Sequence, residues 1–229
     1  MDAEEGTPSS ARSTIGAGRE DPPTDWGDLR ERAIVESATK ILTERATSRV
    51  SVAEIARGAG LSRPSVYFYF DSKQDIVDAA LARVAQRMTA PAVRLAADPE
   101  VTFEKAADIL VGEVISTWRA HRGLIIAAEE IAHQESDARE AWRGAVVTAA
   151  RALTAIVERD RANGVLPAMG GDTDQQVQAV AWMIERCCYM LFTRDHTSGE
   201  EERLQSTLTH LFTRAFGLHD RTGPTAPEP

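Results

Sequence analysis

Arg63, Tyr67, Tyr69 and Lys73 place a guanidinium, two phenols and an ammonium group within one short stretch of the chain. A guanidinium can donate paired hydrogen bonds to the edge of a guanine, and hydroxyl and ammonium groups bind phosphate oxygens. The candidate contacts to nucleic acid in and around this stretch are Ser51, Ser62, Arg63, Pro64, Ser65, Tyr67, Tyr69 and Lys73. Any one of them could be an ordinary surface residue, so the hypothesis depends on whether the local structure brings them to one surface.

Helix-capping signals predict how this stretch folds. Ser51 and Glu54 form a Ser-x-x-Glu capping box, which begins a short helix. Gly60 is suited to the left-handed conformation that ends such a helix. Ser62 then caps a second helix, with Pro64 in its first turn. Two helices joined by a short turn that contains glycine are typical of a helix-turn-helix that binds DNA.

The second of these helices has two distinct faces. Val66 and Phe70 are four residues apart and suit a core, which leaves Arg63 and the two tyrosines outside. A further capping box over residues 72–75 begins a third helix, with Lys73 in its first turn. A cation at that position opposes the helix dipole, so we expect a partner outside the helix, such as a DNA phosphate, to use its charge.

Residues 33–81 resemble the N-terminal domain of TetR-family transcriptional regulators. The resemblance is carried by the apolar first helix AIVESATKIL, the segment SVAEIARGAGLS, the aromatic-rich recognition helix RPSVYFYF and the DSK that follows it. It implies an all-helical homodimer with a divergent C-terminal domain that binds a small effector. The segments SRPSVYFYFDSK and VERDRANGVLP are similar to the narrower branch of EthR-type repressors.

The distribution of charge along the chain agrees with this interpretation. The 229 residues are 43% hydrophobic and 27% charged, as in an ordinary globular protein. The net charge of −9 by itself argues against a nucleic-acid partner. Residues 28–94, however, hold 11 Lys and Arg against 8 Asp and Glu, so the positive charge lies on the segment that contains the helix-turn-helix.

The chain has no feature that predicts a membrane partner or export. No apolar run approaches membrane-spanning length and no signal-peptide pattern is present, so we expect a cytoplasmic protein. The composition of residues 1–27 and 218–229 predicts disordered tails. Between them we expect a helix-turn-helix DNA-binding domain over 28–75 and an effector-binding and dimerisation domain over 76–217.

Apolar stripes predict the helices that flank and follow the reading segment. The first helix, from about residue 28 to 45, should bury Leu29, Ala33, Ala38, Ile41 and Leu42. A linker helix over about 73–97 should be kinked or broken near Ala90 by Pro91. The segments at about 174–194 and 202–216 should pair with their mates in a four-helix bundle, with Leu208 on the shared face.

The resemblance implies that the effector lies between the helices that follow the linker. Apolar residues on the stripes that face this space are Leu110, Val114, Trp118, Trp142, Val146, Ala149, Ile184 and Phe212. Because no charge is among them, we expect a neutral, hydrophobic ligand. Periodicity does not distinguish a pocket from a dry core, so both interpretations remain open.

Other chemistries have weaker support. Glu130 and His133 have the spacing of a di-iron motif, but no second copy exists, so we expect a solvated polar face and no metal or other cofactor. Cys187 and Cys188 could sense oxidation, yet they lie in an apolar helix, which favours core packing. No nucleophile elbow, phosphate loop or zinc-protease motif indicates an enzyme.

The favoured prediction is an all-α, ligand-responsive transcriptional repressor. It has an N-terminal three-helix helix-turn-helix domain and a C-terminal helical domain for ligand binding and dimerisation. Its partners would be a near-palindromic double-stranded DNA operator, a second copy of the chain and a hydrophobic small molecule that releases the DNA. The alternatives are a helical-bundle enzyme and a protein-interaction adaptor that does not bind DNA.

Overall fold

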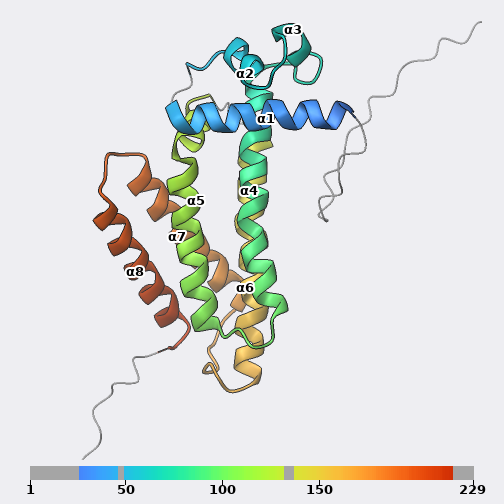
Figure 1. The fold of residues 1–229 in the computed structure, drawn as a ribbon. Coiled ribbons are helices and arrows are strands. Elements are labelled where there is room, and N and C mark those ends of the chain that lie inside the picture. The colour runs from blue at the N-terminus through green and yellow to red at the C-terminus, as the bar shows by residue number, and fades with distance from the viewer. Residues whose placement is uncertain (1–25, 46–48, 132–136, 219–229) are drawn as a thin grey trace, which may run out of the picture.

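The computed structural model describes residues 26–45, 49–131 and 137–218, and within these ranges all regular secondary structure is helical, which confirms the all-α prediction (Figure 1). The helices are α1 (Trp26–Arg45), α2 (Val52–Gly58), α3 (Arg63–Val66), α4 (Lys73–Ala97), α5 (Phe103–Ile131), α6 (Asp137–Ala162), α7 (Thr173–Phe192) and α8 (Ser198–Ala215).

The long helices form a bundle with the two shortest helices at one end (Figure 1). α4 and α5 run along the length of the molecule, and α1 crosses both of them near the end that carries α2 and α3. α6 packs along α4, α7 packs against α6 and α5, and α8 packs against α5. α4 therefore connects the end that carries α2 and α3 with the bundle.

The helix caps form as the sequence predicts. The Ser51 hydroxyl accepts a hydrogen bond from the Glu54 amide, and the Glu54 carboxylate accepts one from the Ser51 amide. Gly60 has φ of 69°, the left-handed conformation that ends α2. Ser62 caps α3, and a second capping box at Ser72 begins α4. These local bonds fix where α2, α3 and α4 begin and where α2 ends.

The core beneath α2 and α3 holds them on α1 and α4. Val66 is fully buried and Phe70 is 8% exposed, as the spacing predicts. The Ser37 hydroxyl of α1 donates a buried hydrogen bond to the Ile55 carbonyl of α2, at 2.8 Å. Leu29 is 45% exposed, so the prediction that it lies on the buried face of α1 is wrong. The buried face of α1 consists instead of Ile34, Val35, Ala38 and Leu42.

The sequence predicts a kink or a break in the linker helix near Ala90, and of these two the break does not occur. α4 continues through Pro91 to Ala97, and Pro91 is buried. A proline removes one backbone hydrogen bond, here the one to the Arg87 carbonyl, but tertiary packing can hold the helix together around it. The irregular backbone lies in α5 instead, where His121 has φ of −122° and ψ of 16°.

Buried polar contacts fix the ends of three helices. The Asp160 carboxylate on α6 is 4% exposed and accepts a hydrogen bond from the Phe103 amide, at 2.7 Å, at the start of α5. Arg159 donates to the carbonyls of Asp98 and Val101, in the connection between α4 and α5. The end of α4 and the start of α5 are thereby tied to α6.

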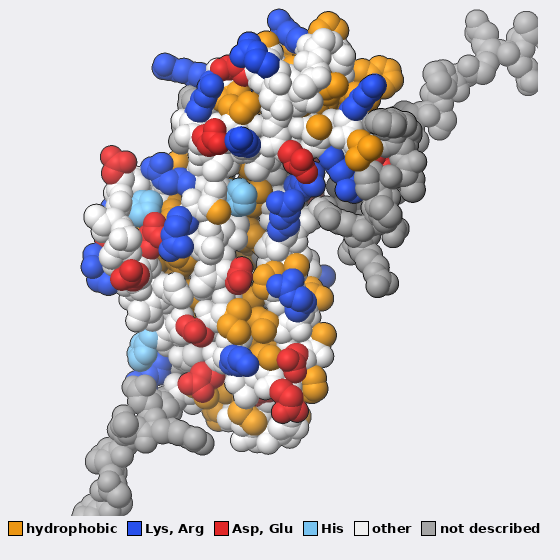
Figure 2. Space-filling view, in the orientation of Figure 1, with side chains coloured by type: hydrophobic (Ala, Val, Ile, Leu, Met, Phe, Trp, Pro, Cys, Tyr) orange, Lys and Arg blue, Asp and Glu red, His pale blue; other side chains and the backbone are white. Residues whose placement is uncertain are grey.

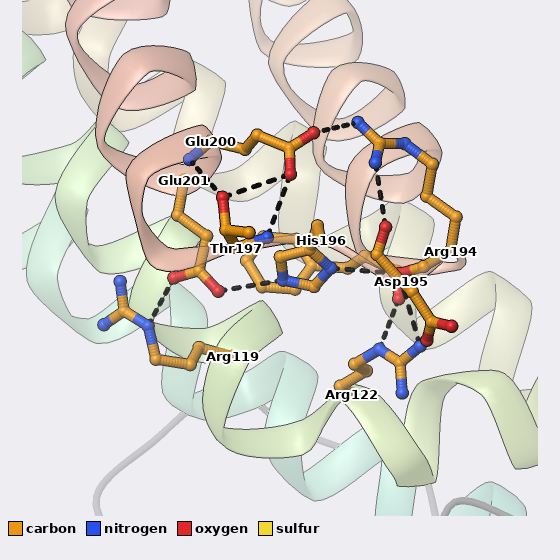
Figure 3. Close-up of polar contacts among 9 residues, drawn as sticks. Arg119, Arg122, Arg194, Asp195, His196, Thr197, Glu200 and Glu201 are labelled. Carbon is orange, nitrogen blue, oxygen red and sulfur yellow. Dashed lines mark hydrogen bonds and ion pairs between the residues drawn. The ribbon is translucent and has the colours of Figure 1, made fainter.

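A second polar cluster fixes the α7–α8 connection on α5 (Figure 3). Arg119 donates to Glu201, with 2.6 Å between Nε and Oε2, and the other Glu201 oxygen lies 2.9 Å from His196 Nε2. Arg122 Nε donates to the Phe192 carbonyl at 2.6 Å. Since Glu201 is only 7% exposed, these contacts orient α7 and α8 against α5.

Some expectations fall on residues that the structure does not describe. Residues 1–25 and 219–229 cover most of the two predicted tails, and His133 of the di-iron spacing lies in the gap between α5 and α6. α1 begins at Trp26, inside the range assigned to the first tail. Among the described helices, none is long and apolar enough to cross a membrane.

Candidate nucleic-acid interface and ligand cavity

The end of the molecule that carries α2 and α3 presents a cluster of exposed side chains. α3 is a single turn, so the chain after Val66 forms a tight turn rather than a longer helix. Arg63 and Pro64 are exposed, and Tyr67 is 40% exposed. We define the reading surface as Arg63, Pro64, Ser65, Tyr67 and Phe68.

Short-range contacts hold Arg63 in an outward position. Its Nη2 lies 3.3 Å from the Tyr67 hydroxyl, and its guanidinium carbon lies 5.5 Å from the centre of the Tyr67 ring. The Ser62 and Ser65 hydroxyls, which flank Arg63 at the start of α3, are 2.7 Å apart. A guanidinium braced in this way loses less side-chain entropy when it binds a base edge.

Four of the predicted DNA contacts are not part of the reading surface, namely Ser51, Ser62, Tyr69 and Lys73. The Ser51 hydroxyl is exposed but already occupied in the cap of α2. Hydrogen bonds from the Ser51 amide and then from Arg45 lower the pKa of Glu54 to about 2, so this capping carboxylate stays ionised. Tyr69 is half-buried against the core rather than fully outside, and Lys73 begins α4. Their roles remain predictions.

Phe68 is a candidate contact that the sequence reasoning missed. Its side chain is 85% exposed, the most exposed of the large hydrophobic residues described, and its ring meets the Tyr69 ring edge-on at 5.2 Å. The spacing of Val66 and Phe70 could have identified Phe68 as exposed. Phe68 lies midway between these two buried positions, and the residue midway along a helical turn points away from the core. An apolar ring in this position suits contact with a thymine methyl group.

Basic side chains predominate around the same end. Figure 2 shows Lys and Arg concentrated over α1, α2 and α3, whereas acidic side chains are more frequent over the rest of the visible face. This arrangement agrees with the excess of positive charge in residues 28–94. A positive end opposite an acidic body orients such a molecule toward a phosphate backbone.

A second candidate site is a cavity of about 210 Å³ inside the bundle. α4, α5, α6 and α7 line it, and Phe212 of α8 contributes one wall. Seven of the eight predicted ligand-binding residues line this cavity, namely Leu110, Val114, Trp118, Val146, Ala149, Ile184 and Phe212. Of the two interpretations, a pocket and a dry core, the structure therefore agrees with a pocket. That a ligand binds in it remains a prediction.

Trp142 is the predicted lining residue that the structure places elsewhere. It packs edge-on against Trp118, with ring centres 5.8 Å apart, and so supports the wall without lining the space. The residues that the prediction omitted include four on α4, namely Val84, Arg87, Met88 and Pro91. The linker helix is thus part of the cavity wall.

Charged residues that the sequence reasoning did not name also line the cavity. Arg87, Glu113 and Glu185 line it, together with His121 at the irregular point of α5. Burial, and then the positive charge of Arg87, lower the pKa of His121. Its imidazole is therefore neutral at pH 7, and the site combines apolar walls with a few polar groups.

Neither cysteine chemistry nor a metal centre emerges from the described residues. Burial is the largest cause that raises the pKa of Cys188 to about 12, followed by the nearby Cys187 and Glu185. A thiol with that pKa is unreactive and packs as a small apolar residue. In the part of the chain that the structure describes, no group of His, Cys, Asp and Glu could hold a metal ion.

Comparison with known families agrees with both halves of the molecule. Residues 34–80 match the family described as "Bacterial regulatory proteins, tetR family", and residues 106–216 match "Transcriptional regulator EthR, C-terminal domain". The first match contains the reading surface, and the second contains every cavity-lining residue outside α4.

Individual relatives extend the comparison over most of the chain. The HTH-type transcriptional regulator EthR of Mycobacterium tuberculosis is 28% identical over 187 residues, which are 81% of this chain and 86% of that protein. The regulator of the same name from Mycolicibacterium smegmatis is 27% identical over 194 residues, covering 81% of this chain and 85% of that protein. The fatty acid degradation regulator FadR of Bacillus halodurans shares the fold, with a TM-score of 0.65 at 17% identity over 88% of this chain and 99% of that one.

Proposed function

This chain belongs to the TetR family of transcriptional regulators, and on that premise we propose that it is a ligand-responsive repressor. It binds a near-palindromic operator as a homodimer, and a hydrophobic small molecule in the cavity releases it from DNA. The observation that carries the proposal is that α4 belongs to both sites. Its first turn follows the reading surface, and Val84, Arg87, Met88 and Pro91 line the cavity.

The shared helix supplies a physical route from ligand to DNA. A ligand that occupies the cavity contacts the C-terminal half of α4. α1 packs on the N-terminal half of α4, which follows the reading surface in the chain. There Arg83 of α4 donates a hydrogen bond to Glu36 of α1. A shift of α4 relative to α6 and α7 changes the separation of the two reading surfaces in a dimer. Successive major grooves are roughly 34–36 Å apart, so a change in that separation weakens binding. The ligand must bind the released state more tightly, since equal affinity shifts nothing.

The outer face of α7 and α8 is the proposed contact between protomers. Met183, Cys187 and Met190 follow helical spacing along α7, and Leu204 and Leu211 follow it along α8. Met183 is 36% exposed, Met190 61% and Leu211 46%, so this face carries apolar surface that the protomer does not bury. A two-fold axis through this face would bury it in a four-helix bundle.

An electrophoretic mobility shift with the DNA upstream of the protein's own coding region tests the proposal. We expect a specific shift that survives an excess of random DNA. We also expect the DNA that the protein protects in a footprinting experiment to contain two half-sites, one or more helical turns apart. The repressor proposal would be wrong if the protein gave no specific shift on that DNA and also selected no preferred sequence from a library of random DNA.

Substitutions on the reading surface should separate base reading from phosphate binding. Arg63→Ala should lose about 1–3 kcal/mol on the specific site and little on random DNA, because a bidentate contact to guanine discriminates between bases. Lys73→Ala should weaken binding to both DNAs and reduce the salt dependence by about one phosphate contact. Titrations at several salt concentrations measure both effects.

Arg151→Ala is the matched control for this pair, because Arg151 is exposed on α6, in the C-terminal half of the molecule. It should leave both affinities unchanged. Equal losses on specific and random DNA for Arg63→Ala would show that Arg63 binds phosphate and does not read bases.

A further inference from the structure

One turn of α5, residues 118–122, contacts two parts of the molecule at once. Trp118 and His121 line the cavity. Arg119 and Arg122, on another side of the helix, donate hydrogen bonds to the start of α8 and to the end of α7 (Figure 3). The helical backbone is interrupted within this turn, at His121. We define residues 118–122 as the coupling segment.

The coupling segment holds Phe192, the last residue of α7, by its ring and by its backbone. The Phe192 ring stacks on the Trp118 ring, with 6.0 Å between the ring centres. Its carbonyl accepts a hydrogen bond from Arg122 Nε at 2.6 Å, and Arg122 Nη2 lies 3.4 Å from the Arg194 carbonyl. Because Phe192 is fully buried in a close-packed interior, a shift of Trp118 or Arg122 moves the end of α7 or breaks these contacts.

Glu201 extends the same set of contacts to α8. Its carboxylate is 7% exposed in the first turn of α8 and is bonded through one oxygen to Arg119 and through the other to His196. The His196 ring in turn packs edge-on against Phe192, with 4.8 Å between the ring centres. Since a buried carboxylate is costly without its partners, Glu201 keeps α8 in register with α5 and with the end of α7.

The cavity lies between two of the helices that these contacts join. α5 lines it with Leu110 and Val114, and α7 lines it with Ala181 and Ile184. A group that fills the cavity presses these helices apart and so lengthens the Arg122 hydrogen bond to the end of α7. The outer face of α7 and α8 is the proposed contact between protomers, and small helix shifts at such a contact change how well the two copies fit.

We propose that the coupling segment links the cavity to the contact between protomers, so that a ligand in the cavity weakens the dimer. This effect is separate from the route through α4, which changes the spacing of the reading surfaces within an intact dimer. The inference rests on the proposed function in that it takes the cavity as the effector site and the face of α7 and α8 as the dimer contact. Linkage makes the effect reciprocal, so dimer assembly weakens ligand binding by the same factor.

Sedimentation of the full-length protein, labelled with a fluorophore at its N-terminus, measures the dimer dissociation constant from nanomolar to micromolar concentration. Ala149→Trp fills the cavity from α6 and needs no identified ligand. It should raise the dissociation constant roughly five-fold or more, the range of typical coupling between sites. Ala155→Trp is the matched control, because Ala155 is exposed on the same helix, and it should leave the constant unchanged.

Arg122→Gln removes the bond between the coupling segment and the end of α7. In this background Ala149→Trp should change the dissociation constant by less than about two-fold, and a double-mutant cycle isolates the difference. Arg119→Gln should reduce the effect of Ala149→Trp in the same direction, because it releases Glu201. Arg151→Gln, at an exposed position of α6, should leave that effect at its full size.

The link would be overturned by an unchanged or lower dissociation constant in folded Ala149→Trp protein. An equal effect of Ala149→Trp in the wild-type and Arg122→Gln backgrounds would also overturn it. If Ala149→Trp does not fold, Ala149→Leu fills part of the same space and decides the question. A wild type that dimerises and binds the operator, but whose dimer does not respond to these variants, loses only this inference. A wild type that is monomeric at micromolar concentration contradicts the proposed homodimer as well.

Discussion

Met190→Glu combined with Leu211→Glu should leave a folded protomer that has lost operator binding by roughly 100-fold or more. Met190 is 61% exposed and Leu211 is 46% exposed on the proposed contact between protomers. Two carboxylates on each copy would face their mates across the two-fold axis, where charge repulsion and desolvation oppose association. Linking two reading surfaces increases affinity by roughly 10²- to 10⁴-fold, so a monomer loses about that factor.

Sedimentation, circular dichroism and DNA titration measure this prediction together. The expected variant sediments as a monomer, has the helical content of the wild type and binds specific DNA only weakly. If it remains a dimer at micromolar concentration, the protomers associate through another face. Met183→Glu should act in the same direction but less strongly, because Met183 is only 36% exposed.

Leu208→Glu provides a contrast on the same helix. Leu208 is 1% exposed within a single protomer, so the prediction that it lies on the shared face of the dimer is wrong. A carboxylate in that position enters the protomer core, where loss of a leucine alone costs about 2–5 kcal/mol and an unpaired charge adds to it. We expect loss of helical content with Leu208→Glu and retention of it with Leu211→Glu.

Ala149→Trp should act as a permanently bound ligand. Ala149 lines the cavity on α6, the helix that packs along α4, and α4 joins the cavity to the reading surface. An indole in this space pushes on α4 in the way that we propose for the effector. Operator affinity should fall at least about ten-fold, which corresponds to about 1.4 kcal/mol. The variant should also no longer bind apolar ligands that the wild-type cavity binds, because the space is filled.

Ala155→Trp is the matched control, because Ala155 lies on the same helix with its side chain exposed. It should bind operator and ligand as the wild type does. Thermal unfolding should show that Ala149→Trp remains folded, although overpacking costs typically about 1–3 kcal/mol. A folded, dimeric Ala149→Trp variant with wild-type operator affinity would show that the cavity is not coupled to the reading surface.

Interactions between near neighbours were predictable from the sequence alone. The capping boxes at Ser51 and Ser72 and the glycine conformation at Gly60 depend on residues within one turn of each other. Their geometry is therefore set by residue type and spacing. The spacing of Val66 and Phe70 likewise determined which face of the recognition segment is buried.

Apolar spacing also placed seven of the eight proposed ligand contacts on faces that meet in one space. It did not determine what fills that space, because the same stripe can close on itself or leave a void. Trp142 illustrates the limit, since it lies on the right stripe but packs against Trp118. A stripe fixes the direction of a side chain about its own helix and not the distance to the next one.

Only the tertiary structure decided which of several similar residues holds each role. Leu208 and Leu211 are both apolar residues of α8, yet the first is buried and the second is exposed, because α8 packs on α5 along only one side. Pro91 remains helical because neighbouring helices enclose it, against its local preference. Arg87, His121 and Glu185 come from three helices, and no local pattern in the sequence joins them. They meet at one cavity because the packing of α4, α5 and α7 sets distances that residue spacing within each helix does not encode.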